Sequence, residues 1–77
     1  MNVRVFLRNP LHRGRASAPR KYELNETVTE IVGTAEVRDG GLDLQVTALY
    51  SDKGSEVASP WDHIFLPASK IDLYIIE

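Results

Sequence analysis

The feature that most constrains the fold is an alternation of apolar and polar residues that follows a glycine-rich turn. Every second residue from Leu42 to Tyr50 is apolar, and most of the residues between them are polar. A period of two is typical of a strand with one buried and one solvated face. The preceding Asp39-Gly40-Gly41 indicates a type I′ hairpin turn, because both central positions of such a turn need positive φ. The pattern therefore predicts an antiparallel hairpin.

Two placements of this turn put different side chains opposite each other. With Gly40-Gly41 at the centre, Arg38 faces Asp43; with Asp39-Gly40 at the centre, Glu36 faces Asp43. Like charges directly opposite each other destabilise a sheet, whereas a favourable pair contributes ~0.2–1 kcal/mol. We therefore predict the first register.

The segment from residue 3 to residue 8 also alternates, with valine and leucine on one side and arginine on the other. We expect Asn9-Pro10 to end this strand, because proline has no N–H for the ladder and restricts the residue before it. The residues that follow include three Arg, two Ala, one Ser and one Pro, so we predict a basic loop over residues 8–21.

Residues 21–38 are rich in β-branched residues, and their apolar face changes along the segment. Ile31 and Ala35 share one face with Gly33, whereas Val28 falls on the other. Such a change is expected where a strand bends around a small barrel. Gly33 is the predicted bending point, because it has no side chain to obstruct the bend.

Two short strands are predicted near the C-terminal end of the sequence, at residues 63–66 and 71–76. Pro67 ends the first, and residues 68–70 form a single turn between them. Residues 51–62 have the polar composition of a variable connector, and no stretch of ten residues shows uninterrupted helical periodicity. The sequence therefore predicts one all-β domain over residues 1–77, a small, strongly bent barrel of five strands.

A barrel of this size has little core to stabilise it. A chain of 77 residues buries only ~60–65% of the surface that it exposes when unfolded. It has no cysteine for a disulfide or a thiolate metal site, and its two histidines do not make a structural metal site. Since small domains are otherwise supported by partner chains, we predict a homo-oligomer without a cofactor.

The charges are unevenly distributed. Six of the nine Lys and Arg residues lie in residues 1–21 without any acid, whereas all eleven acidic residues lie in residues 22–77. Two interpretations remain open: a basic arm that binds the phosphates of RNA or DNA, or a basic segment that folds over an acidic body of its own or a neighbouring chain.

Nothing in the sequence indicates an enzyme or a membrane protein. Asp62-His63 has no accompanying nucleophile, and adjacent residues of a strand point to opposite faces. The longest apolar runs are about three residues, too short to cross a membrane. We predict a non-enzymatic protein with a cytoplasmic location.

The segment Gly33-Thr34-Ala35-Glu36-Val37-Arg38-Asp39-Gly40-Gly41-Leu42-Asp43-Leu44 resembles the first motif of the Sm-like proteins, the superfamily of Sm, Lsm and Hfq proteins. That motif has a glycine in a bent strand, an aspartate six residues later, then a hydrophobe and an asparagine; Asp43 stands at the asparagine position. The segment from Ile64 to Ile75 resembles the second motif, with Pro67-Ala68 in place of the usual Arg-Gly or Lys-His.

The resemblance implies a five-stranded barrel that pairs edge strands with its neighbours, forms a ring of five to seven subunits and binds single-stranded RNA. It implies that Asp39, Asp43 and the stretch Pro67-Ala68 line a pore-side pocket for a base. The candidate nucleic-acid-binding residues are these two aspartates, a neighbouring lysine and four residues of the basic segment: Asp39, Asp43, Lys70, Arg13, Arg15, Arg20 and Lys21.

Two other functions are compatible with the sequence. A protein-interaction or assembly module would keep the ring and not bind RNA; Asp43 and Pro67-Ala68 favour it, because they replace groups that recognise RNA in the family. A nucleotide sensor resembling PilZ proteins is suggested by arginines upstream of Asp39-Gly40-Gly41, although the serine expected in that motif is missing.

Overall fold

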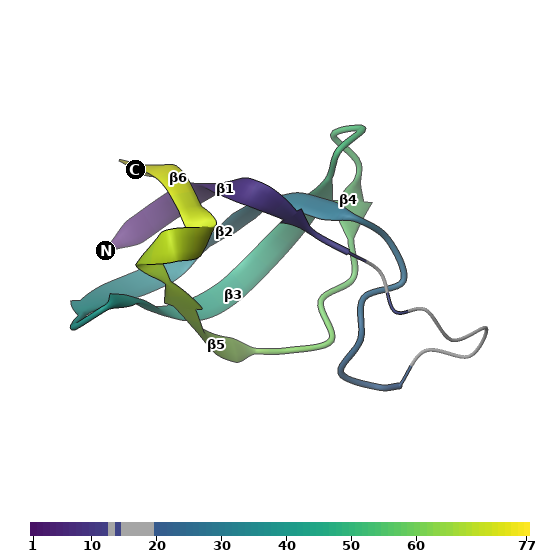
Figure 1. The fold of residues 1–77 in the computed structure, drawn as a ribbon, viewed down its shortest axis with the longest axis horizontal. Coiled ribbons are helices and arrows are strands. Elements are labelled where there is room, and N and C mark those ends of the chain that lie inside the picture. Colours follow the sequence, from purple (N-terminus) through teal and green to yellow (C-terminus); the bar gives the residue numbers. More distant parts are fainter. Residues whose placement is uncertain (13, 15–19) are drawn as a thin grey trace.

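The computed structural model describes residues 1–12, 14 and 20–77, and in these residues the chain is all-β. One antiparallel sheet contains six strands in the described part of the chain (Figure 1). The strands are β1 (Asn2–Leu11), β2 (Val28–Arg38), β3 (Gly41–Ser51), β4 (Glu56–Val57), β5 (His63–Pro67) and β6 (Ile71–Ile76), with one 3-10 turn, η1 (Ala68–Lys70), before β6. The predicted all-β class is confirmed.

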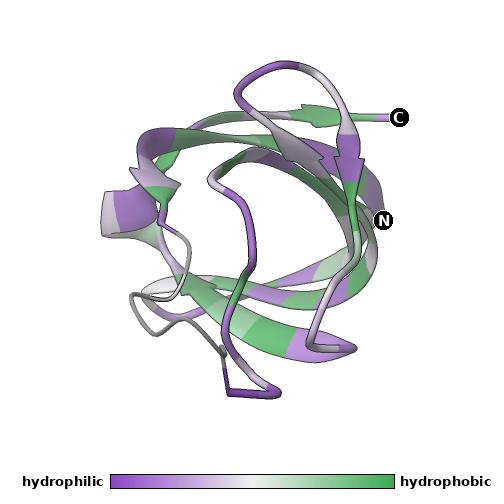
Figure 2. Cartoon of the chain, turned by 90° about the vertical axis from the view of Figure 1, so that its right-hand side faces the viewer, coloured by the Kyte–Doolittle hydropathy of each residue, from purple (hydrophilic) through white to green (hydrophobic). Residues whose placement is uncertain are grey.

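The strand order is β4-β3-β2-β1-β6, and β5 pairs with the part of β3 that precedes the part paired with β4. The sheet curls around its core, as the end view shows (Figure 2). Over the described residues β6 pairs only with β1 and β5 only with β3, so the hydrogen-bonded sheet is not closed. The prediction of five strands is wrong, because β4 forms inside the expected connector and pairs with Leu49 and Tyr50.

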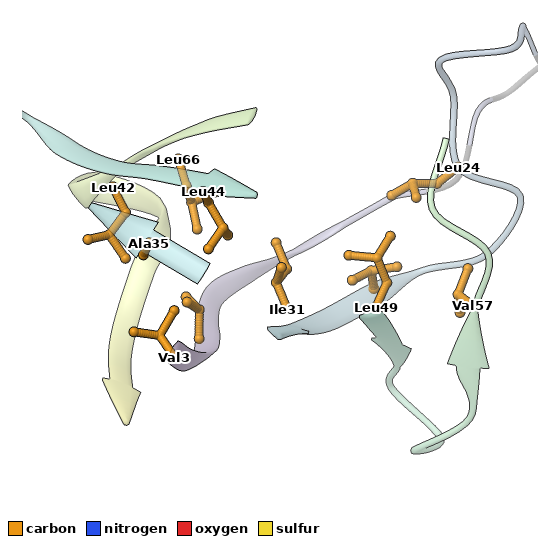
Figure 3. Close-up of a cluster of buried hydrophobic side chains, with 11 residues drawn as sticks. Val3, Leu24, Ile31, Ala35, Leu42, Leu44, Leu49, Val57 and Leu66 are labelled. Carbon is orange, nitrogen blue, oxygen red and sulfur yellow. The ribbon is translucent and has the colours of Figure 1, made fainter. Parts of the chain in front are cut away.

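The core runs along the length of the molecule, whose extents are 35 × 23 × 20 Å. Val3, Leu42 and Leu44 lie at one end of the cluster of buried side chains, and Leu24 and Val57 lie at the other (Figure 3). A long, thin core leaves many side chains near its margin, which is consistent with the small size of the chain.

β1 continues to Leu11, so the prediction that Asn9-Pro10 ends it is wrong, and residues 8–11 belong to the strand rather than to a loop. The pairing of β1 with β6 extends only to Leu7, which pairs with Ile71, and the β1–β2 register shifts between Phe6 and Leu11. Beyond Leu7 the strand has no β6 neighbour. Proline is compatible with an edge position, where its missing N–H costs no ladder hydrogen bond.

Gly33 lies at an irregularity between β2 and β3, as expected for the bending point. It pairs with Val46, whereas Val32 pairs with Ala48, so Thr47 is a bulge residue without a partner. A Cβ on Gly33 would overlap the carbonyl oxygen of Gln45. The absence of a side chain therefore allows the two backbones to approach at the bend.

The bulge changes which face of β3 is buried. Leu42 and Leu44 face the core before the bulge, and Leu49 faces it afterwards. The expectation of one continuous apolar face from Leu42 to Tyr50 is therefore wrong in its last third. The extra residue shifts the period by one, so Tyr50 lies opposite Glu30 on the outer side of the sheet.

The predicted hairpin register is wrong. Arg38 pairs with Gly41, so the turn residues are Asp39 and Gly40, and only Gly40 has a positive φ, of 85°. The type I′ prediction fails with the register, because Asp39 has a negative φ.

Glu36 consequently lies opposite Asp43, the pairing of like charges that the predicted register avoids. Arg38 contacts both carboxylates, donating from Nη2 to Glu36 and holding Nε 3.8 Å from Asp43 Oδ2. His63 contacts the other oxygen of Asp43 from the neighbouring strand. The contacts of Arg38 and His63 offset the repulsion between the Glu36 and Asp43 carboxylates, although neither residue is the β2 ladder partner of Asp43.

The C-terminal strands agree with the prediction, since β5, η1 and β6 occupy nearly the expected residues. The segment before β2 differs. No strand forms in residues 20–27, where Leu24 is buried and the neighbouring residues are mostly exposed.

Candidate functional site

The predicted site residues occupy two opposite ends of the molecule (Figure 1). Asp39 and Asp43 belong to the β2–β3 hairpin and Lys70 to the neighbouring η1, whereas Arg20 and Lys21 lie in the segment between β1 and β2. Arg13 and Arg15 lie outside the described residues.

At the hairpin end, η1 docks onto the turn and leaves a groove beside it. The Ala68 N–H donates to the carbonyl oxygen of Gly40 at 2.9 Å, and Gly41 pairs with Pro67. The groove has a volume of ≈ 300 Å³ and lies between the hairpin, η1 and β6. Its lining is mainly apolar and includes Val37 and Tyr74.

The three predicted residues at this end lie around the groove rather than in its lining. Asp43 is engaged by His63 and Arg38, and Asp39 is exposed at the turn. Lys70 is exposed in the last turn of η1. The fold thus brings the two motif segments together around an apolar groove. The lining of the groove includes Arg38, and Asp39, Asp43 and Lys70 lie around it, so the charges near the groove are of mixed sign.

At the opposite end, Arg20 and Lys21 border a shallow hollow of ≈ 340 Å³ together with Ser59 and Pro60. Arg20 Nη1 donates to the Tyr22 hydroxyl at 2.6 Å, and its guanidinium lies 6.0 Å from the centre of that ring. Its Nε lies 3.6 Å from a Glu23 carboxylate oxygen. These groups make a partly neutralised, aromatic and basic surface.

A hydrogen bond to the backbone of Tyr22 fixes the position of this residue in the surface. The Trp61 indole N–H donates to the Tyr22 carbonyl oxygen at 2.8 Å, and the Tyr22 side chain is 54% exposed. An exposed aromatic ring beside arginine is a group on which a base of single-stranded nucleic acid stacks.

Arg4 in β1 is committed to acidic partners. It donates to Glu30 and lies 3.5 Å from a carboxylate oxygen of Glu77. The hydrogen bond to Glu30 and the charges of both carboxylates raise the pKa of the Arg4 guanidinium, so it stays charged. Its charge stabilises the sheet and is not a vacant site for phosphate.

The exposed apolar residues of the edge strands β5 and β6 were not predicted from the sequence. Phe65 in β5 is 51% exposed, and in β6 the exposed fractions are 51% for Leu73, 46% for Ile75 and 64% for Ile76. A signal was present in the sequence, because β6 is apolar at five of its six positions, a pattern typical of a strand covered on both faces.

Comparison of the chain with protein-family models, curated proteins and solved structures finds no significant match. No helix in the described residues has the length and apolar character needed to cross a membrane. The same part of the chain holds no group of three or more His, Cys, Asp or Glu residues placed to bind a metal ion.

Proposed function

We propose that this chain is a non-enzymatic, Sm-like small barrel that functions as a protein-assembly module and joins copies of itself into a ring of five to seven subunits. The observation that carries the proposal is the exposure of apolar side chains on β5 and β6, each of which has only one strand neighbour among the described residues. Unpaired edges that display apolar residues are templates for pairing with another chain.

The matching faces of the two strands favour β5 of one copy as the partner of β6 of the next. Ile64 and Leu66 of β5 pair with core residues of β3, and Tyr74 and Ile76 of β6 pair with core residues of β1. An antiparallel junction that keeps both core faces on one side places Leu66 opposite Tyr74 and Ile64 opposite Ile76.

The same register also brings favourable pairs of side chains together on the outer side of the junction. It places Phe65 opposite Ile75, and His63 opposite Glu77, a pair that is favourable whenever the histidine is protonated. If β6 shifted by two residues along β5, Asp72 instead of Tyr74 would lie opposite the buried Leu66. Burial of the Asp72 carboxylate beside an apolar side chain would be unfavourable. The junction would cover Ile76, the most exposed of the large apolar residues.

Light scattering tests the assembly. We expect the wild-type protein to have a mass that is a multiple of a five- to sevenfold assembly of the 8.6 kDa chain, and Ile76→Glu to give a monomer. Thr34→Glu is the matched control, because Thr34 is exposed on β2, away from both edges. A folded wild-type monomer would rule out the ring.

Cysteine cross-linking tests the register, since the natural chain has no cysteine. The double variant Phe65→Cys/Ile75→Cys is expected to give a ladder of disulfide-linked multimers after oxidation. Phe65→Cys/Thr34→Cys, with the second cysteine outside the junction, should stay largely unlinked. Equal ladders from both double variants would contradict the proposed pairing.

Binding of single-stranded RNA or other nucleic acid is the second candidate function, and the exposed Tyr22 ring beside Arg20 favours it. The site would be the surface of Arg20, Lys21 and Tyr22, at the far end from the hairpin groove. We place it second because Glu23 already neutralises part of the charge.

Fluorescence anisotropy with a labelled oligo-U of about 20 nucleotides tests this second function. We expect binding to weaken with salt, and Arg20→Ala/Lys21→Ala to reduce the slope of log K against log[salt] by about 2. Lys53→Ala is the control, an exposed lysine in the β3–β4 loop. Absent or salt-insensitive binding by the wild type would remove nucleic acid from consideration.

A further inference from the structure

The outer face of the sheet, opposite the core, is unusually apolar. The solvated face of an antiparallel sheet is normally polar, yet outward positions of four adjacent strands carry large or apolar side chains. These residues, here called the outer face, are Leu73 and Ile75 of β6, Phe6 of β1, Val32 of β2, and Ala48 and Tyr50 of β3.

The ladder places these side chains in two neighbouring rows. In one row Leu73 is opposite Phe6, and Phe6 is opposite Glu30, which faces Tyr50. In the other, Ile75 is opposite Arg4, and Arg4 is opposite Val32, which faces Ala48. Side chains that are opposite each other lie ~4.5–5.5 Å apart at Cβ, so the rows form one continuous patch.

The charged side chains of the outer face contact one another. Arg4 bonds Glu30 and lies near Glu77, and its guanidinium is 5.8 Å from the centre of the Tyr50 ring. Two carboxylates beside one guanidinium disfavour nucleic acid. At its margin Thr34 donates to Asn2, so an apolar centre is bordered by polar groups, as in protein–protein interfaces.

We propose that the outer face binds the outer face of a second copy, so that two rings stack back to back. An opposite-charge pair at the centre of an apolar patch is self-complementary: a two-fold axis between Arg4 and Glu30 brings each arginine over the glutamate of the other copy. The proposal rests on the ring proposed above, because the contact needs to be repeated.

The repetition follows from the size of the patch. Four strands at ~4.8 Å spacing span ~19 Å, and two rows of outward side chains occupy ~13 Å along the strands. The patch therefore covers roughly 250 Å², much less than the ~800 Å² per partner of a stable protein–protein interface. A single contact of this kind is weak. Repeated around a ring, it benefits from the high effective concentration of the remaining sites.

Light scattering of folded variants tests the stacking. We expect the wild type to have twice the mass of Val32→Lys and of Ala48→Lys, which introduce like charges into the facing patches on two different strands. Circular dichroism checks that each variant is folded, and the second variant serves if the first is not. Ala58→Lys, at an exposed residue of the loop between β4 and β5 and outside the patch, should keep the wild-type mass.

The outcomes separate this inference from the proposed function. A wild-type ring of five to seven chains, unchanged by either lysine variant, overturns the stacking and leaves the ring intact; the outer face would then be solvated or belong to a different protein. A wild-type monomer overturns both. Halving of the mass by Val32→Lys and by Ala48→Lys but not by Ala58→Lys supports the stacked rings.

Discussion

Replacing Gly33 with alanine is expected to lower the free energy of unfolding by about 3 kcal/mol, a large share of the stability of a small domain. The new Cβ would overlap the backbone carbonyl oxygen of Gln45, and backbone cannot move aside as the end of a flexible side chain does. Relief requires β2 and β3 to separate at the bend. Urea unfolding followed by the fluorescence of Trp61, at one fixed protein concentration, measures the change.

Gly40→Ala is the control for this experiment. Gly40 has a φ of 85°, but a Cβ at this position would have no neighbouring atom within 4 Å, so only the left-handed backbone opposes a side chain there. We expect a cost of about 1 kcal/mol. Equal losses for the two variants would mean that close approach of the strands at Gly33 is not what requires glycine.

Leu49→Ala is expected to destabilise the protein by about 2–5 kcal/mol, through lost apolar burial and the cavity left behind. Leu49 is fully buried and lies opposite Ile31, which is also fully buried, in the middle of the core. Thermal unfolding by calorimetry, again at fixed concentration, provides the measurement.

Val37→Ala is the matched comparison, an apolar truncation on the neighbouring strand β2. The Val37 side chain is 62% exposed, so we expect a loss below about 1 kcal/mol. A loss as large as that of Leu49→Ala would show that Val37 is covered in solution, as in a tightly packed assembly.

Much of the sheet was predictable because local signals determined it. The alternation after Gly41 and the proline at the end of β5 identified elements that the structure contains. Gly33 was identified as the bending point from its lack of a side chain, and the overlap that a Cβ would make with Gln45 gives the same physical reason.

The register was not predictable from pairs of residues alone. The predicted register depends on which side chain faces Asp43, the favourable Arg38 or the unfavourable Glu36. In the structure Arg38 and His63 approach the two carboxylates from other positions and remove much of the repulsion. The bulge at Thr47 was also missed, because inserting one residue changes the exposed face without leaving a distinctive residue type.

The candidate site was predictable only in part. The resemblance of the two motifs led to the hairpin and η1 segments, which the fold does bring together at Gly40 and Ala68. The location of the basic residues Arg20 and Lys21 at the other end is a property of the tertiary structure, which no local sequence pattern encodes (Figure 1).

The interior position of β1, between two strands that are distant from each other in the sequence, has a consequence for folding. β1 lies between β2 and β6, and Arg4 contacts Glu77 across a separation of 73 residues. The chain loses the conformational entropy of closing this long loop before the contact can stabilise it. We therefore expect slow folding, in the millisecond-to-second range. During translation β1 can pair with β2 early. Its other edge stays unpaired until β6 leaves the ribosome, and during that interval the nascent chain can pair wrongly with other chains.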